Sequence, residues 1–156
     1  MKKRVINITL IAMLSSTAAL NGGAVETDKL VAEALKETGE IEPQKLKQMI
    51  DKEEAVIVLD VRESEQRAEG QIYTDKFFAI TRGNLEFEVT NQIKDKNAVI
   101  VTYCRGGGRG VLAAQTLRHL GYKNATNLKG GLKGWATLGY PIETGLGVTK
   151  LTEEEK

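Results

Sequence analysis

Residues 97–121, NAVIVTYCRGGGRGVLAAQTLRHLG, decide how this chain of 156 residues folds. Residues 97–103 form a β-branched apolar run, typical of a strand buried on both faces of a parallel sheet. Residues 110–120 carry apolar side chains at helical spacing, and Gly121 predicts a left-handed cap after them. The glycine-rich loop between them therefore joins the carboxyl end of a strand to a helix, which is where open α/β sheets bind ligands.

The remainder of the chain alternates strands and helices in the same way. Further strands are predicted at 55–61, 76–80 and 124–128, and helices at 26–38, 43–51, 63–70, 83–93 and 130–140. In the first helix, one side carries Leu30, Val31, Ala34 and Leu35 and is expected to face the core. The order predicts an α/β fold with a mainly parallel central sheet of about five strands, flanked by helices on both faces.

Residues 1–24 have the order of a secretory signal peptide, with a basic start, a short apolar run and then small residues. The apolar run is shorter than the roughly 20 residues that span a bilayer. We therefore expect cleavage between residues 18 and 24 and a periplasmic or secreted protein with no membrane attachment. The mature chain is expected to have a helical extension (25–40), one domain (41–145) and a loose tail (146–156).

The charge distribution argues against a nucleic-acid partner. The whole chain has a formal net charge of +1, and loss of residues 1–24 removes three basic residues and no acid, leaving 19 Lys and Arg against 21 Asp and Glu. Residues 96–142, however, contain seven basic residues and no acid. Two interpretations stay open: compensation for the acid-rich segment before it, or a positive field that attracts a small anion.

Cys104 is the single cysteine, so the chain cannot form an internal disulfide. A lone cysteine also excludes dithiol redox chemistry and argues against a thiolate zinc site, so no metal is expected. The thiol is then an inert buried group, an intermolecular link or a reactive nucleophile.

Three phosphate-binding interpretations of the loop fail on its residues or their spacing. Gly108, Gly110 and Ala113 match a dinucleotide fingerprint, but the required acid about 20 residues later is absent, because the next one is Glu143. No Gly-Lys-Ser/Thr follows the glycines, which excludes a Walker loop. Cysteine phosphatases, and with them arsenate reductases, need five residues between cysteine and arginine. Only four separate Cys104 from Arg109, and this smaller ring suits a sulfur atom better than a phosphate.

Several motifs occur in one order: VLDVRESEQRAEGQI (58–72), RGNLEF (82–87), YCRGGGRGVLAAQTLRHLGYKNATNLKGGLKGW (103–135) and GYPIE (139–143). In these the chain resembles single-domain, exported members of the rhodanese sulfurtransferase family. The resemblance implies that Cys104 takes the sulfane sulfur of thiosulfate as a persulfide and passes it to cyanide or another thiophilic acceptor, without a cofactor. The alternative is a rhodanese-fold sulfur carrier, sensor or protein-binding module with little turnover.

The same resemblance assigns roles within the site. Arg105 and Arg109 are expected to favour the thiolate and bind the oxygens of the donor, while the amides of residues 105–109, including Gly106, Gly107 and Gly108, hold the terminal sulfur. Four residues are expected to give structural support: Asp60, Arg62 and Glu69 as an ion-pair cluster, and Trp135 through packing. His119 and Arg82 are expected to be structural or at the surface. The chain departs from the family pattern at Gln71, usually histidine, and at Gly110, often serine.

Overall fold

The computed structural model describes residues 22–150 and contains a parallel sheet of five strands. Its spatial order is β1-β6-β5-β2-β4, and the register places Asp60 at the end of β2 opposite Tyr103 at the end of β5. The strands are β1 (Glu40–Ile41), β2 (Val56–Asp60), β4 (Phe77–Ala79), β5 (Val99–Tyr103) and β6 (Ala125–Leu128).

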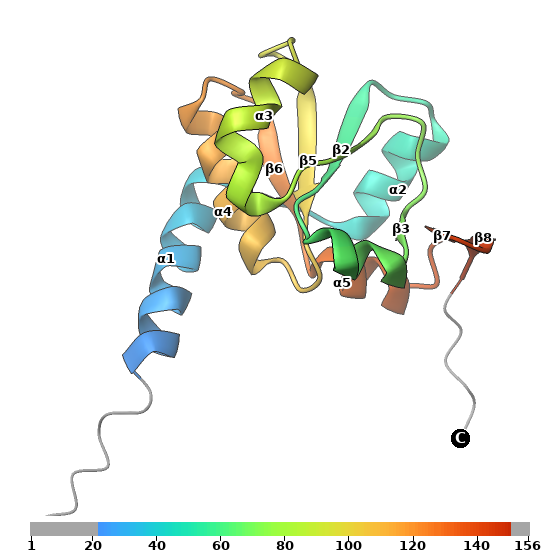
Figure 1. Cartoon of the computed structure of the whole chain (residues 1–156), viewed down its shortest axis with the longest axis horizontal. Helices are drawn as coiled ribbons and strands as arrows, with labels where there is room; N and C mark the ends of the chain where they lie inside the picture. Colours follow the sequence, from blue (N-terminus) through green and yellow to red (C-terminus); the bar gives the residue numbers. More distant parts are fainter. Residues whose placement is uncertain (1–21, 151–156) are drawn as a thin grey trace, which may run out of the picture.

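Helices cover both faces of this sheet (Figure 1). One core cluster lies between the sheet and α3 (Leu85–Gln92) and α4 (Gly108–His119), and the other lies between the sheet and α2 (Pro43–Asp51) and α5 (Gly131–Thr137). Two 3-10 segments, η1 (Ser64–Glu69) and η2 (Arg82–Asn84), complete the connections. The predicted α/β class, the parallel five-stranded sheet and the helices on both faces are confirmed.

A small antiparallel sheet was not predicted. It has the order β3-β7-β8 and consists of β3 (Gln71–Ile72), β7 (Ile142–Thr144) and β8 (Gly147–Thr149). Strands of two or three residues are too short to show an alternating pattern, so the sequence carries no signal for them. β8 lies within the segment expected to be a loose tail, and the last six residues of that tail lie outside the described residues.

The first helix, α1 (Gly22–Thr38), differs from its prediction. It begins at Gly22, four residues before the predicted start at residue 26. Its amino-terminal half extends away from the domain (Figure 1). Leu30 was expected to face the core, but it is 58% exposed, because only the second half of α1, with Ala34 and Thr38 buried, packs against α4. The predicted signal peptide lies almost wholly outside the described residues, and export stays a prediction. No helix within residues 22–150 is long and apolar enough to cross a membrane.

A buried ion pair joins the carboxyl end of β2 to its surroundings. Asp60 and Arg62 are both fully buried, with Arg62 Nη2 2.6 Å from Asp60 Oδ2. Arg62 also donates to the carbonyls of Gln66 (2.9 Å) and Gly70 (2.7 Å). The hydroxyl of Tyr103 donates to Asp60 Oδ2 at 2.9 Å, and burial, with the charge on Asp60, raises the pKa of Tyr103 above its usual range. The pair thus ties together β2, η1, Gly70 just before β3, and β5.

We expect Asp60→Asn to destabilise the protein by about 3–5 kcal/mol, because it leaves the Arg62 guanidinium buried without a counter-charge. Urea unfolding measures this as a lower midpoint with an unchanged slope. Glu86→Gln is the control, since it breaks the partly exposed Arg82–Glu86 pair (2.9 Å) and should cost about 1 kcal/mol or less. Equal losses in the two variants would contradict a special role for the buried pair.

Candidate active site

Cys104 directly follows β5, and its side chain is almost fully buried, with 3% of the residue exposed. The backbone N–H of Gly107 donates to Cys104 Sγ at 3.1 Å. Gly107 has a φ of 110°, which L side chains rarely adopt, so glycine is needed at this position to aim that N–H at the sulfur. The sulfur therefore accepts a backbone hydrogen bond at the amino terminus of α4.

Helix α4 begins at Gly108, two residues earlier than predicted. The prediction was wrong because the run of glycines hides the helical pattern, although the turn at Gly107 already starts the helix. Arg109 consequently lies in the first turn of α4 rather than in the loop before it. The cup around the sulfur is therefore part loop and part helix terminus, where backbone N–H groups lack partners within the helix.

Helix α5 holds the other side of the loop. The N–H of Leu132 donates to the Cys104 carbonyl at 2.8 Å, and the N–H of Lys133 donates to the Arg105 carbonyl at 3.0 Å. This approach requires glycine at position 131, because a Cβ there would lie 2.4 Å from the Cys104 carbonyl oxygen. Sequence reasoning recognised the motif NLKGGLKGW but missed this contact, for which the Gly130–Gly131 pair was the only signal.

Both arginines of the loop are partnered by η1. Arg105, whose side chain is 67% exposed, has its Nε 3.6 Å from Glu69 Oε2. Arg109 Nη2 donates to Gln66 Oε1 at 2.9 Å. Glu69 also lies 3.8 Å from Arg62 Nη1, so the expected cluster of Asp60, Arg62 and Glu69 does assemble and extends to Arg105. Nothing in the sequence marked Gln66 as part of the site.

The other residues singled out in the sequence have contact partners other than the sulfur. Trp135 of α5 is fully buried, donates to the Pro141 carbonyl at 2.8 Å and packs edge-on against Tyr140. Arg82 donates to Glu86 and Thr116, and Gln71 donates to Glu143. The exposed His119 lies 2.9 Å from Glu37. Residues 22–150 contain no group of three or more His, Cys, Asp or Glu placed to hold a metal ion.

The glycine at position 110 is explained by its neighbour Asn127. A Cβ at Gly110 would lie 2.2 Å from Asn127 Oδ1, so the Asn127 side chain takes the room that a serine would need. Asn127 is fully buried, and its Nδ2 donates to Glu40 Oε1 at 2.9 Å, which limits its freedom to move aside. Glycine at position 110, where the family often has serine, therefore fits the limited space beside Asn127.

Gly131→Ala should destabilise the protein by about 1–3 kcal/mol, because the new Cβ pushes α5 away from the loop. It should also speed alkylation of Cys104 by iodoacetamide, because the displaced helix uncovers the buried thiol. Gly106→Ala is the matched control. A Cβ at Gly106 meets nothing within 4 Å, so its effect on stability should stay within about 0.5 kcal/mol. Urea unfolding and alkylation rates check both variants, and a Gly131→Ala protein with wild-type values would contradict the close contact.

Comparison with known proteins shows the family of this chain. Residues 42–138 match the rhodanese-like domain, and the chain belongs to that family. It is 32% identical over 103 residues to a sulfurtransferase of Allochromatium vinosum, covering 66% of this chain and 92% of that protein. It is also 32% identical over 116 residues to the thiosulfate sulfurtransferase GlpE of Actinobacillus succinogenes, covering 70% of this chain and 94% of the relative.

A solved structure supports the fold. The polysulfide-sulfur transferase homodimer from Wolinella succinogenes superposes with a TM-score of 0.67 at 24% identity, covering 78% of this chain and 90% of that one. The fold and the sulfurtransferase relatives together support sulfur transfer as the general activity of the family to which this chain belongs.

Proposed function

We propose that this protein is a sulfurtransferase that takes sulfane sulfur from thiosulfate or a similar anionic donor and carries it as a persulfide on Cys104. It then delivers the sulfur to cyanide or to a thiol acceptor. The observation that carries the proposal is the hydrogen bond from the Gly107 N–H to Cys104 Sγ, at the meeting point of β5, α4 and α5. A sulfur held at a helix amino terminus is placed to act as a nucleophile.

In the first step, the Cys104 thiolate attacks the outer sulfur of thiosulfate. The new S–S bond forms on Cys104 as the S–S bond of the donor breaks, and sulfite leaves with the electron pair. In the second step, cyanide or a thiolate attacks the outer sulfur of the persulfide, and the electron pair of the broken S–S bond returns to Cys104. Neither step changes the proton count of the protein when the thiolate is already formed.

The protein groups that support these steps are backbone N–H groups and arginines. The amides of the loop and of the first turn of α4 can hold the outer persulfide sulfur, and the guanidinium of Arg109 can bind the oxygens of the donor. Because the thiolate needs no base, the absence of histidine at position 71 is no obstacle. His119 has no part in the reaction, since it is at the surface beside Glu37.

Incubation of the protein with thiosulfate should add the mass of one sulfur atom to the intact chain. Cys104→Ser should show no adduct, because it removes the only thiol. Cyanide added to the loaded protein should restore the original mass and form thiocyanate. An unmodified wild-type chain would refute the proposal, and a stable adduct that cyanide cannot discharge would favour the sulfur-carrier alternative.

Arg109→Ala should lower the second-order rate of thiosulfate loading by about tenfold or more, which corresponds to the loss of a hydrogen bond to a charged group. Intact mass measured against time gives the rate. The control is Lys123→Ala, which removes one positive charge from the turn after the far end of α4. Equal rates for Arg109→Ala and Lys123→Ala would remove Arg109 from donor binding.

A further inference from the structure

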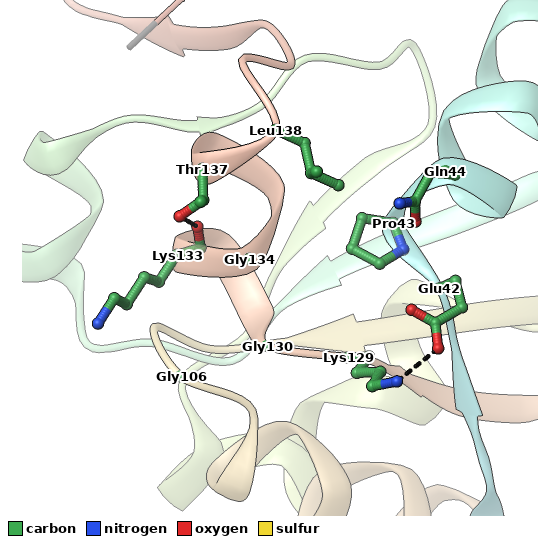
Figure 2. Close-up of a pocket in the computed structure, with 10 residues that line it drawn as sticks. All are labelled: Glu42, Pro43, Gln44, Gly106, Lys129, Gly130, Lys133, Gly134, Thr137 and Leu138. Atoms are coloured by element: carbon green, nitrogen blue, oxygen red, sulfur yellow. Dashed lines mark hydrogen bonds and ion pairs between the residues drawn. The ribbon is translucent and has the colours of Figure 1, made fainter. Parts of the chain in front are cut away.

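An open depression of about 420 Å³ lies beside the active-site loop (Figure 2). Its floor includes Gly134 of α5, and its walls include Pro43 and Leu138 on one side and Gly106 and Lys133 on the other. Gly106 is two residues from Cys104, so the depression adjoins the loop that holds the sulfur. A volume of this order is typical of sites for small organic ligands and far exceeds the needs of cyanide or thiosulfate.

The two lysines of the depression differ in their electrostatic state. Lys129 Nζ lies 2.6 Å from Glu42 Oε1, and this hydrogen bond raises the pKa of Lys129, so the two charges neutralise each other. Lys133 is exposed, and its ammonium group forms no ion pair within residues 22–150. The uncompensated charge of the depression is therefore the positive charge of Lys133.

The position of Lys133 is set by the loop itself. Its backbone N–H donates to the Arg105 carbonyl at 3.0 Å, which fixes the base of the side chain next to the active-site loop. The side chain extends outward from α5, away from Pro43 and Gln44, on the side of the depression where Gly106 lies (Figure 2). An anionic group paired with Lys133 would lie on the side of the depression that adjoins the active-site loop at Gly106.

We propose that this depression binds the sulfur acceptor, and that the acceptor is a peptide-sized thiol carrying a carboxylate. The carboxylate pairs with Lys133, and the less polar part rests over Gly134 against Pro43 and Leu138. This inference rests on the proposed function. The acceptor thiolate attacks the outer sulfur of the Cys104 persulfide, a new S–S bond forms on the acceptor, and the electron pair of the broken bond returns to Cys104.

The test begins with protein loaded by thiosulfate, with the persulfide verified by intact mass. Discharge rates are then measured with two thiols of similar size: reduced glutathione, which has two carboxylates, and its diethyl ester, which has none. The ratio of the two rates cancels any effect of a substitution on the persulfide itself. Lys133→Gln should lower this ratio by about two- to fivefold, as expected for one exposed ion pair. Lys133→Glu should lower it further.

Two controls separate a local effect from a general one. The double variant Glu42→Gln/Lys129→Gln removes the neutral ion pair of the depression without changing net charge, and it should keep the wild-type ratio. Lys123→Gln lowers the net charge of the protein at a distance and should keep it too. If either control lowers the ratio as much as Lys133→Gln does, the assignment to Lys133 is overturned.

The stages of the experiment distinguish failure of the inference from failure of the proposed function. No persulfide after thiosulfate treatment would overturn the proposed function and this inference with it. A persulfide that forms and is discharged by cyanide, together with a ratio that is the same in wild type, Lys133→Gln and Lys133→Glu, would overturn the acceptor site alone.

Discussion

The buried ion pair of Asp60 and Arg62 is the constraint on which the site depends. Burying two charges is costly unless every remaining hydrogen-bonding group finds a partner. Here Arg62 satisfies its donors on Asp60 and on the carbonyls of Gln66 and Gly70, and Asp60 accepts the hydroxyl of Tyr103, the residue before Cys104. The pair therefore fixes η1 against the end of β5. Because η1 supplies the partners of Arg105 and Arg109, the buried pair also helps to position these two arginines.

The loop is shaped from two directions. At the amino terminus of α4, the N–H of the N-cap residue Gly107 points toward the sulfur. Helix α5 draws the carbonyls of Cys104 and Arg105 outward by donating to them. Carbonyl oxygens held in this way cannot face an anionic sulfur, so the interior of the loop is left to N–H groups. Both effects need glycines in unusual places, one at Gly107 for its φ and one at Gly131 for close approach.

Much of the fold could be predicted because its main elements carry strong patterns. The apolar runs of β2 and β5 are long enough to identify buried parallel strands, and α4 shows clear helical spacing. The small sheet of β3, β7 and β8 could not be predicted, because strands this short have no periodicity. Cys104 and its two arginines were recognisable from their spacing. Gln66 and the contacts of α5 were not, because they depend on which segments the folded chain brings together. The prediction for Leu30 was wrong because the helical spacing of apolar residues does not show where along its length α1 stops packing against α4.

The partners of Arg105 and Arg109 differ in charge. Arg105 faces the carboxylate of Glu69, whereas Arg109 is held by the neutral amide of Gln66 and forms no ion pair within residues 22–150. The neutral amide of Gln66 orients the guanidinium of Arg109 but does not compensate its positive charge. Arg109 therefore keeps a positive charge with which a small anion can pair. If the site binds an anionic sulfur donor as we propose, chloride, sulfate and phosphate would compete with the donor for this charge. The effective donor affinity would then depend on the anions of the surrounding fluid as well as on the residues of the protein.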